Sequence, residues 1–464
     1  MIHQRAIFPC ASLTWKPLVK LLATIAILKQ LMNAHRPDNL ASQSPMSETR
    51  APIAPRRPYR HSYHGVDLED PYYWLQDPNY PQVDDADVLA YLNAENDYFE
   101  SWFAPHQGLT QTLFEELKSR KPEQDESVPY EKNGYRYQWR FRAGDQYRIW
   151  LRQPITPQLG PWETLLDENV LATGCEYFRL GALAVSPDGS KLAYSTDSNG
   201  SERFTLKVIE IDSGDELTPA IENCAGSVVW NASNTGFAYR LVNDQWRPDK
   251  ALFRDLTTGD DTLLYEEHDE SFFVGLGLSQ SEQLMFISAG DHITSEVRFV
   301  PRDDVLATPT VISPRRSGHE YDVDHQGNSA TSGRLIIRSN RQQANFDVFE
   351  TPVTTPDESN WQVMLAGDDR HYLMGHVAFA SATVVCLRID GLDQIQIIDD
   401  AGTHQVDFPE PAYSLDLGTN PTYDTDTLRI AYTSMVTPHT VYDFNWRQGT
   451  LTALKVQEIP DGYD

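Results

Sequence analysis

Three of the adjacent pairs of aspartates in this sequence are residues whose type and spacing could bind a cation or transfer protons. Paired carboxylates suit hard cations and acid–base chemistry. Each pair nevertheless falls in a short polar stretch between apolar runs, where Asp is favoured because its side chain accepts hydrogen bonds from nearby backbone amides. We therefore interpret all three pairs as turns and predict no metal site. The pairs are Asp303-Asp304, Asp368-Asp369 and Asp399-Asp400.

The histidines and cysteines form no recognisable catalytic or metal-binding motif. The cysteines are far apart, without C-x-x-C spacing, which predicts neither a disulfide framework nor a zinc site and favours a reducing compartment. A glycine-rich phosphate loop and an H-E-x-x-H motif are also absent from the sequence, so we predict no cofactor. The cysteines are Cys10, Cys175, Cys224 and Cys386. Six of the 13 histidines lie in polar segments, where we expect mostly exposed side chains without a chemical role: His61, His64, His268, His319, His325 and His371.

The formal net charge of −29 over 464 residues narrows the possible partners. Nucleic-acid binding requires Lys and Arg to neutralise phosphates, and no basic patch with interleaved aromatic residues is present, so we exclude that class of function. An acidic surface could attract cationic peptides, although the simpler interpretation is that it keeps the protein in solution. An apolar content of 40% is typical of a chain that buries a core.

Residues 1–45 differ from the rest in charge. Their apolar run at 18–31 is interrupted by two lysines and is too short to span a bilayer, so no membrane partner is predicted. A true translation start at Met46 is the favoured explanation and implies a cytoplasmic protein. A signal peptide and an exported protein are the alternative, although no small-x-small cleavage site follows convincingly. The basic residues of this segment, against the single acid Asp38, are Arg5, Lys16, Lys20, Lys29 and Arg36.

Residues 46–126 are predicted to form an N-terminal arm and two helices. The arm at 51–63 is rich in Pro and Arg and is expected to be extended. Apolar residues then recur at helical spacing, which predicts two amphipathic helices broken near Pro105 and ended at Lys121-Pro122. The apolar positions are Val88, Tyr91, Leu92, Tyr98, Phe99 and Trp102, then Leu109, Leu113, Phe114 and Leu117.

From Ser127 onward the sequence shows a weak repeat of short alternating strands. Its clearest copy, at 184–194, places Pro187-Asp188-Gly189 between two strands, where Pro fixes φ and Gly supplies a positive φ. Four strands with their turns account for the spacing of 44 to 57 residues between copies. The repeat predicts a mainly β protein with a seven-bladed β-propeller over residues 127–457, preceded by a short α-helical N-terminal segment. The six other repeat turns precede Tyr135, Phe237, Leu284, Leu335, Val384 and Leu428.

Several local stretches resemble the prolyl oligopeptidase family of serine peptidases, and within it oligopeptidase B. The first are residues 70–77 (DPYYWLQD) and 91–96 (YLNAEN), which resemble the N-terminal signature of the family. The resemblance extends in order over about residues 50–464. Its other stretches are 166–169 (LDEN), 185–189 (VSPDG), 411–414 (PAYS), 437–443 (TPHTVYD) and 455–464 (KVQEIPDGYD).

This resemblance implies a cytosolic serine endopeptidase of two domains. In the family an α/β-hydrolase domain carries a Ser-Asp-His triad, and the propeller covers that domain and admits only short peptides. The resemblance also implies that the arm and helices wrap onto the hydrolase domain. The oligopeptidase B branch prefers bonds after Arg or Lys, so the implied partners are the hydrolase domain and short, cationic peptides.

The chemistry of that family is not found in this sequence. The nucleophile requires a G-x-S-x-G turn, and the nearest segment, residues 327–331 (GNSAT), lacks the second Gly and falls inside a repeat. We therefore predict no catalytic residue, assign no substrate-binding residue, and expect a chain that is inactive alone, with the α/β-hydrolase domain absent and residues 458–464 as a linker to it. The alternatives are a free-standing propeller that binds proteins or peptides, and a decayed gene product.

Overall fold

The computed structural model describes residues 50–464 except 81, 156, 461 and 463–464, so the predicted extension at 1–45 lies outside the described residues. The chain divides into two compact units, which we describe separately. The described part of the N-terminal unit runs from residue 50 to Pro122 and resumes at Ile459, and the sheet unit spans Glu123–Glu458. Among the described helices, none combines the length and the apolar character that a membrane span requires.

The N-terminal unit begins with an extended arm and a hairpin, followed by helices. Strands β1 (Arg60–Tyr63) and β2 (Val66–Glu69) pair around His64 and Gly65, both at positive φ, as a two-residue hairpin turn requires. A short 3₁₀ turn, η1 (Tyr73–Leu75), comes next. The predicted break near Pro105 is confirmed, because the 3₁₀ turn η2 (Ala104–His106) separates α2 (Ala86–Phe103) from α3 (Gln107–Ser119).

The prediction of a short α-helical N-terminal segment is wrong. Helix α2 does not begin until Ala86, after the arm and the β1–β2 hairpin, and the two α-helices span 18 and 13 residues. The start of α2 has a local cause, since the Asp85 carboxylate accepts hydrogen bonds from the backbone amides of Asp87 (2.9 Å) and Val88 (3.1 Å).

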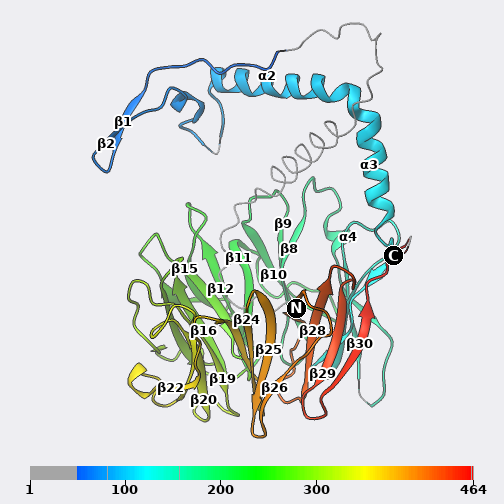
Figure 1. The fold of residues 1–464 in the computed structure, drawn as a ribbon, viewed down its shortest axis with the longest axis vertical. Helices are drawn as coiled ribbons and strands as arrows, with labels where there is room; N and C mark the ends of the chain where they lie inside the picture. The colour runs from blue at the N-terminus through cyan, green and yellow to red at the C-terminus, as the bar shows by residue number, and fades with distance from the viewer. Residues whose placement is uncertain (1–49, 81, 156, 461, 463–464) are drawn as a thin grey trace. The chain divides into compact units, whose positions relative to one another are not determined.

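The sheet unit consists of antiparallel sheets that follow one another along the chain, as the colours of Figure 1 show. The first has five strands, and the last four have four strands each. The first sheet contains β3 (Asp125–Glu126), β4 (Tyr130–Lys132), β5 (Tyr135–Phe141), β6 (Ile149–Pro154) and β7 (Glu163–Asp167), followed by α4 (Glu168–Leu171). The first two four-stranded sheets are β15 (Phe273–Leu278), β16 (Leu284–Gly290), β17 (Ser295–Pro301) and β18 (Thr310–Val311), and then β19 (Tyr321–Gln326), β20 (Arg334–Ser339), β21 (Asp347–Pro352) and β22 (Gln362–Leu365). The second of them includes the 3₁₀ turn η3 (Glu358–Asn360). The last two sheets are β23 (His371–Ala378), β24 (Ala382–Ile389), β25 (Leu392–Asp399) and β26 (Gly402–Gln405), and then β27 (Tyr413–Leu417), β28 (Thr427–Ser434), β29 (Thr440–Asn445) and β30 (Thr450–Val456).

One sheet is larger than a blade. Strand β11 pairs with β10 through Ile221 and Cys224, and with β12 through Cys224 and then Val228 to Trp230, so it is shared by both halves of a seven-stranded sheet. Gly226, at φ +74°, lies where the register shifts. The sheet is formed by β8 (Arg179–Val185), β9 (Lys191–Asp197), β10 (Phe204–Glu210), β11 (Ile221–Trp230), β12 (Gly236–Val242), β13 (Pro248–Asp255) and β14 (Asp261–Glu266).

The predicted number of blades is therefore wrong. Among the described residues, five sheets have the four or five strands of a blade, and the seven-stranded sheet is continuous instead of being split in two. The repeat turns themselves are confirmed, since strands begin at or within two residues of all seven positions that follow them. The sequence thus indicated the hairpins correctly, but β11 joins what we had expected to be separate sheets.

Contacts between the last and first sheets close the unit into a ring. The Arg429 guanidinium donates to the Pro129 carbonyl at 2.7 Å, and the Thr422 hydroxyl donates to the Glu131 carbonyl at 3.3 Å. Lys455, near the end of β30, pairs with Asp125 in β3. A ring of consecutive antiparallel sheets is the architecture of a β-propeller, which confirms the fold type.

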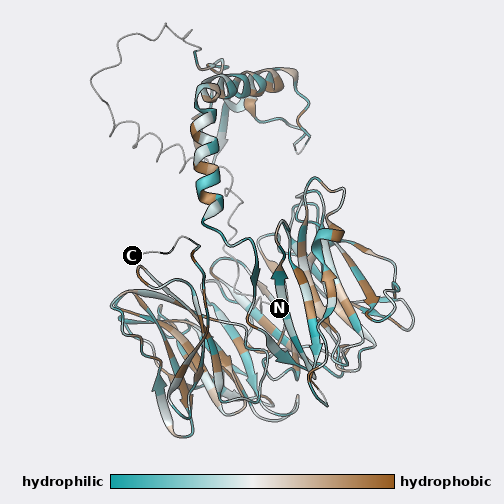
Figure 2. Cartoon of the chain, turned by 90° about the vertical axis from the view of Figure 1, so that its right-hand side faces the viewer, coloured by the Kyte–Doolittle hydropathy of each residue, from teal (hydrophilic) through white to brown (hydrophobic). Residues whose placement is uncertain are grey.

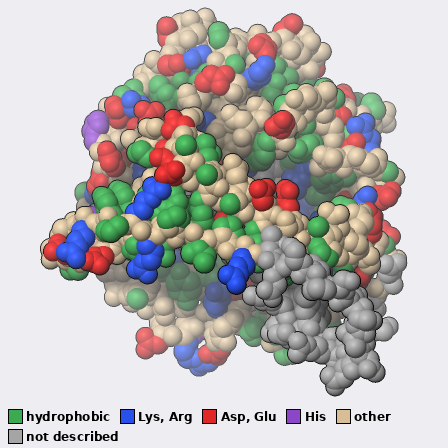
Figure 3. All heavy atoms as spheres, turned by 90° about the horizontal axis from the view of Figure 1, so that it is seen from above, with side chains coloured by type: hydrophobic (Ala, Val, Ile, Leu, Met, Phe, Trp, Pro, Cys, Tyr) green, Lys and Arg blue, Asp and Glu red, His purple; other side chains and the backbone are tan. Residues whose placement is uncertain are grey.

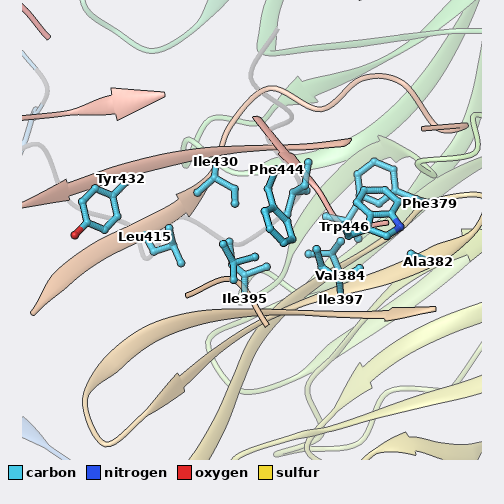
Figure 4. Packing of buried hydrophobic residues seen from close by; sticks show 13 residues of the cluster. Phe379, Ala382, Val384, Ile395, Ile397, Leu415, Ile430, Tyr432, Phe444 and Trp446 are labelled. Atoms are coloured by element: carbon cyan, nitrogen blue, oxygen red, sulfur yellow. The ribbon is translucent and has the colours of Figure 1, made fainter. Parts of the chain in front are cut away.

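Apolar side chains fill the space between neighbouring sheets. In the cluster of Figure 4, Leu415, Ile430 and Phe444 of the last sheet pack with Ile395 and Ile397 of the sheet before it. Similar clusters lie between successive sheets from the first to the last, and one more lies within the seven-stranded sheet, between its two halves. Burial of apolar surface between sheets therefore stabilises the ring.

The helices of the N-terminal unit contrast with this core. Val88 is the one buried hydrophobic residue described in α2, and α3 has none. Apolar stretches alternate with polar ones along α3, as the colours of Figure 2 show. The exposed apolar residues of the helices are Leu89, Leu92, Phe99, Trp102, Leu109, Phe114 and Leu117.

Candidate functional site

All three aspartate pairs lie at turns, as the sequence predicted, and in two of them a carboxylate stabilises the turn. The Asp368 carboxylate accepts hydrogen bonds from the backbone amides of Arg370 (2.8 Å) and His371 (2.9 Å). Asp399 accepts in the same way from the amides of Ala401 (2.8 Å) and Gly402 (3.1 Å). The third pair is exposed in the turn after β17. Within the described ranges, no group of three His, Cys, Asp or Glu side chains is arranged to hold a metal ion.

Two of the histidines expected in exposed polar segments are instead buried. His319 is 3% exposed and His325 is fully buried. The His319 ring stacks on Tyr321, and its Nε2 lies 2.8 Å from the Ser339 hydroxyl. Burial lowers the pKa of His319 to about 4 and also lowers the pKa of His325. His64 and His268 are exposed, as expected, whereas His61 and His371 are half-buried and lie in strands β1 and β23.

His325 connects two turns of neighbouring sheets. Its Nδ1 lies 2.7 Å from the Ser281 hydroxyl and its Nε2 lies 2.9 Å from the Ser332 carbonyl oxygen. A Ser–His contact could signal nucleophilic catalysis, but Ser281 is buried and its hydroxyl also accepts from the Gln283 amide and contacts the Ser279 hydroxyl. These contacts identify Ser281 as a residue that stabilises its turn.

Two of the described cysteines, Cys175 and Cys224, are free thiols. Burial raises the pKa of Cys224 to about 12, which keeps its thiol protonated and unreactive. Cys10 lies outside the described residues.

A cavity of about 520 Å³ lies at one end of the ring, where turns from four sheets converge. They are the β4–β5 turn of the first sheet, the β11–β12 turn of the seven-stranded sheet, the β15–β16 turn and the β27–β28 loop of the last sheet, and the segment after β17 completes the wall. The lining residues are Lys132, Asn133, Ala232, Gln280, Ser281, Glu282, Gln283, Arg302, Asp303, Pro421, Thr422 and Tyr423.

Glu282 is the electrostatic centre of this cavity. Its carboxylate pairs with the Lys132 ammonium group and accepts from the Arg302 guanidinium at 2.8 Å. Burial alone would raise the pKa of Glu282, but the two cations outweigh it and lower the pKa below its usual value, so the carboxylate is ionised. Glu282 holds a positive φ of 58°, which its place in a tight turn imposes. Because Lys132 belongs to the first sheet and Glu282 to the β15–β16 turn, this pair links sheets that are not neighbours.

Sequence reasoning identified the turn at 281–283 but not this site. The partners of Glu282 lie 150 residues before it and 20 residues after it, and no local pattern indicates that they meet. Acidic and basic side chains are interspersed on the face of the molecule that Figure 3 shows. The net charge of the chain therefore does not indicate where this cluster lies. The pairing of β16 with β17 brings Arg302 beside Glu282, whereas the closure of the ring brings Lys132 to it.

Comparison with known proteins settles the family. A family model described as the N-terminal β-propeller domain of prolyl oligopeptidase matches residues 52–457. The chain belongs to the prolyl oligopeptidase family. This confirms the resemblance drawn from the motifs at residues 70–77 and 91–96.

Relatives within this family cover nearly the whole chain. It is 32% identical over 446 residues to dipeptidyl aminopeptidase BI of Pseudoxanthomonas mexicana, which covers 91% of the chain and 59% of that relative. It is 29% identical over 424 residues to protease 2 of Moraxella lacunata, covering 89% and 60%. The structure of oligopeptidase B from Trypanosoma brucei with covalently bound antipain matches with a TM-score of 0.81 at 28% identity, covering 89% and 61%. The chain thus spans about 60% of the length of the relatives it matches.

Proposed function

We propose that this chain is the N-terminal propeller portion of a serine oligopeptidase. The observation that carries the proposal is the match of residues 52–457 to the family's propeller domain, together with coverage of about 60% of the relatives' length. In this proposal the catalytic Ser-Asp-His triad belongs to an α/β-hydrolase domain joined after residues 458–464. The ring restricts access to that triad, and the chain has no peptidase activity alone.

The substrates in this proposal are short peptides cleaved after Arg or Lys. The resemblance to oligopeptidase B supports this choice, and a net charge of −29 would attract cationic peptides. We place the protein in the cytoplasm, since Cys175 and Cys224 are free thiols, as a reducing compartment favours. No residue of the chain is assigned to substrate binding.

The N-terminal unit, within residues 46–126, is proposed to pack against the hydrolase domain. Leu109, Phe114 and Leu117 of α3 are 48%, 56% and 64% exposed, which is more apolar surface than one short helix normally leaves in water. A domain that covers these side chains would gain the free energy of burying them. The proposed occupant is the hydrolase domain of the same protein.

The test is peptide hydrolysis by two purified proteins. The first is this chain, and the second is the chain extended by the hydrolase domain of a relative. Fluorogenic peptides with Arg at the cleaved bond are compared with matched peptides that carry Gln. We expect no hydrolysis by the chain alone and Arg-selective hydrolysis by the extended protein. Hydrolysis by the chain alone would contradict the proposal, as would an extended protein that cleaves the Gln peptides equally well.

A further inference from the structure

Arg240, in strand β12, is a half-buried arginine that meets only neutral partners. Its Nε donates to the Ser227 hydroxyl at 3.0 Å, and one terminal nitrogen donates to the Val274 carbonyl at 2.6 Å. No described residue accepts a hydrogen bond from its other terminal nitrogen or forms an ion pair with it. Burial lowers the pKa of the Arg240 guanidinium to about 10, because no carboxylate offsets the loss of water around it. At neutral pH Arg240 is therefore a charged group with an unused donor.

Arg338, in β20, makes the corresponding contacts but has the carboxylate that Arg240 lacks. Its Nε donates to the Asp322 carboxylate, in the neighbouring strand of its own sheet, at 2.7 Å. A terminal nitrogen donates to the Leu373 carbonyl, in the first strand of the next sheet, at 3.1 Å. Arg240 reaches its neighbouring strand and the first strand of the next sheet in the same way, with Ser227 in place of the aspartate. The sheet unit thus neutralises Arg338 internally and leaves Arg240 without a counter-ion.

Two further arginines lie at the turn between β12 and β13. Arg247 belongs to this turn, and its guanidinium lies 4.7 Å from the centre of the Phe273 ring, one residue before the carbonyl that Arg240 contacts. Strands β12 and β15, which these contacts join, lie side by side in neighbouring sheets (Figure 1). Arg203 donates to the Asn243 carbonyl of the same turn at 2.7 Å. We call Arg203, Arg240 and Arg247 the arginine cluster.

The acids nearest to the arginine cluster along the chain form no ion pair with it. Asp244 is exposed in the turn, and Asp249 accepts from the Asn243 side-chain amide at 3.4 Å. Three cations without a counter-ion therefore lie together in a chain whose net charge is −29. Such a patch attracts an anionic group, and a guanidinium binds a carboxylate through two parallel hydrogen bonds.

The arginine cluster lies at the end of the ring where the chain enters and leaves the sheet unit. Strands β5 and β12 both begin at the cavity, which the turns before them line through Asn133 and Ala232. Both strands therefore end at the opposite end of the ring, and the arginine cluster is at the end of β12. Asp125, at the chain's entry, pairs with Phe141 at the end of β5, and Lys455, just before the exit, pairs with Asp125.

We propose that the arginine cluster binds a carboxylate of the peptide substrate, either its terminal carboxylate or an acidic side chain beyond the cleaved bond. Arg240 supplies the unused donor, and Arg203 and Arg247 supply positive potential beside it. The cluster is specificity-determining, because elsewhere the net negative charge of the chain disfavours an anionic group. The part that concerns substrates rests on the proposed function, in which the hydrolase domain is joined at this end of the ring.

Carboxylate binding is tested on this chain, without hydrolysis, by saturation-transfer NMR. The probes are N-acetyl-glycylglycine with a free carboxylate and the same dipeptide as its amide. We expect transfer to the acid but not to the amide, and loss of most of that signal in Arg240→Gln. Arg247→Gln is the second variant and should lose signal too, while it keeps the contacts of Arg240 if Arg240→Gln fails to fold.

The matched control for this experiment is Arg179→Gln. It makes the same change of charge at an arginine that already pairs with Glu202 at 3.0 Å, so the signal from the acid should remain. Equal transfer to the acid and the amide would overturn the proposal. A signal from the acid that survives both cluster substitutions would also overturn it and would make these arginines structural only.

The role in substrate selection is tested on the extended protein with three peptides that share an Arg at the cleaved bond. The first ends in a free carboxylate, the second ends in an amide, and the third ends in an amide and carries Asp beyond the cleaved bond. For a peptide whose carboxylate binds the cluster, Arg240→Gln should raise KM by about fivefold or more and change kcat by less than about twofold. An effect on the first peptide identifies the terminal carboxylate as the bound group, and an effect on the third identifies the side chain.

The amide peptide without Asp should keep its KM in Arg240→Gln. Equal changes of KM for all three peptides, or no change for any, would overturn the role in substrate selection. An extended protein that cleaves none of them would refute the proposed function, and carboxylate binding by the cluster is then decided by the NMR experiment on the chain alone.

Discussion

Phe349 and Phe114 show how differently the two units use the same side chain. Phe349, in β21, is fully buried between sheets, whereas Phe114, in α3, is 56% exposed. The ring satisfies its apolar residues internally by packing each sheet against the next. The helices present theirs to solvent. The difference teaches that the ring buries its apolar side chains between its own sheets, whereas the helices of the N-terminal unit leave several of theirs exposed.

The largest expected effect is the loss of unfolding free energy when the buried Phe349 is replaced. Phe349→Ala should lower the free energy of unfolding by about 3–5 kcal/mol, because it removes a buried ring and leaves a cavity. Phe114→Ala is the matched control and should cost less than about 1 kcal/mol, because its side chain is already in contact with water. Urea denaturation followed by Trp fluorescence measures both. Equal losses would mean that the exposed helix face is packed in the isolated chain.

A second prediction concerns pH and the buried ion pairs of the ring. Burial would raise the pKa of Glu267, but hydrogen bonds from Arg315 (2.6 Å) and Tyr265 (2.6 Å) outweigh it and hold the pKa at about 2. A carboxylate with a depressed pKa stabilises the fold above its unfolded pKa, and that contribution is lost as the pH falls. Between pH 5 and pH 2 the wild type should therefore lose about 2–3 kcal/mol that Glu267→Gln does not lose.

The control for this titration is an exposed ion pair. Glu216 pairs with Lys207 at 2.7 Å, and its side chain is 52% exposed. Glu216→Gln should change stability by less than about 1 kcal/mol at any pH. Denaturation curves collected at several pH values compare the three proteins. If Glu267→Gln follows the wild type throughout, the pair does not stabilise the ring.

A smaller effect is expected at the start of α2, in the N-terminal unit. Asp85→Ala removes the side chain that caps the amides of Asp87 and Val88, and should destabilise the helix by about 1 kcal/mol. Hydrogen exchange of residues 86–90 reads this directly. Asp97→Ala, in the middle of the same helix, is the control and should leave those amides unchanged or slow their exchange. Unchanged exchange in Asp85→Ala would show that the cap is dispensable.

The smallest effect on stability is expected for substitutions of the exposed apolar residues of α3. Phe114→Ser with Leu117→Ser should shift the free energy of unfolding by less than about 1 kcal/mol, because both side chains are exposed. The double variant should also lower self-association at high concentration, which light scattering measures. If scattering stays the same, the apolar face of α3 is not what drives contacts between chains.

The sequence was most informative where structure is local. The turn of Pro187, Asp188 and Gly189 was predicted from residue types, and Gly189 does adopt a positive φ of 75°. The two helices and their break near Pro105 followed from spacing in the same way. Each of these features depends on residues a few positions apart, so the chemistry that determines them is visible in a short window.

What the sequence did not predict depends on contacts between distant segments. Nothing local shows that β11 pairs on both sides through Cys224, so two expected blades proved to be one sheet. The burial of His325 and the meeting of Glu282 with Lys132 likewise follow from how the ring closes. The family membership was accessible from short motifs, whereas the cluster of Glu282 with Lys132 and Arg302 was not.

The most direct test of the central claim is covalent labelling of the purified chain with a fluorophosphonate probe, which reacts with activated serines. The account predicts no labelling, because the sequence has no G-x-S-x-G and Ser281 is held in a turn. Ser281→Ala and Ser329→Ala serve as controls for the two serines nearest to a catalytic context. Stoichiometric labelling that either substitution abolishes would show a nucleophile within this chain and contradict the account.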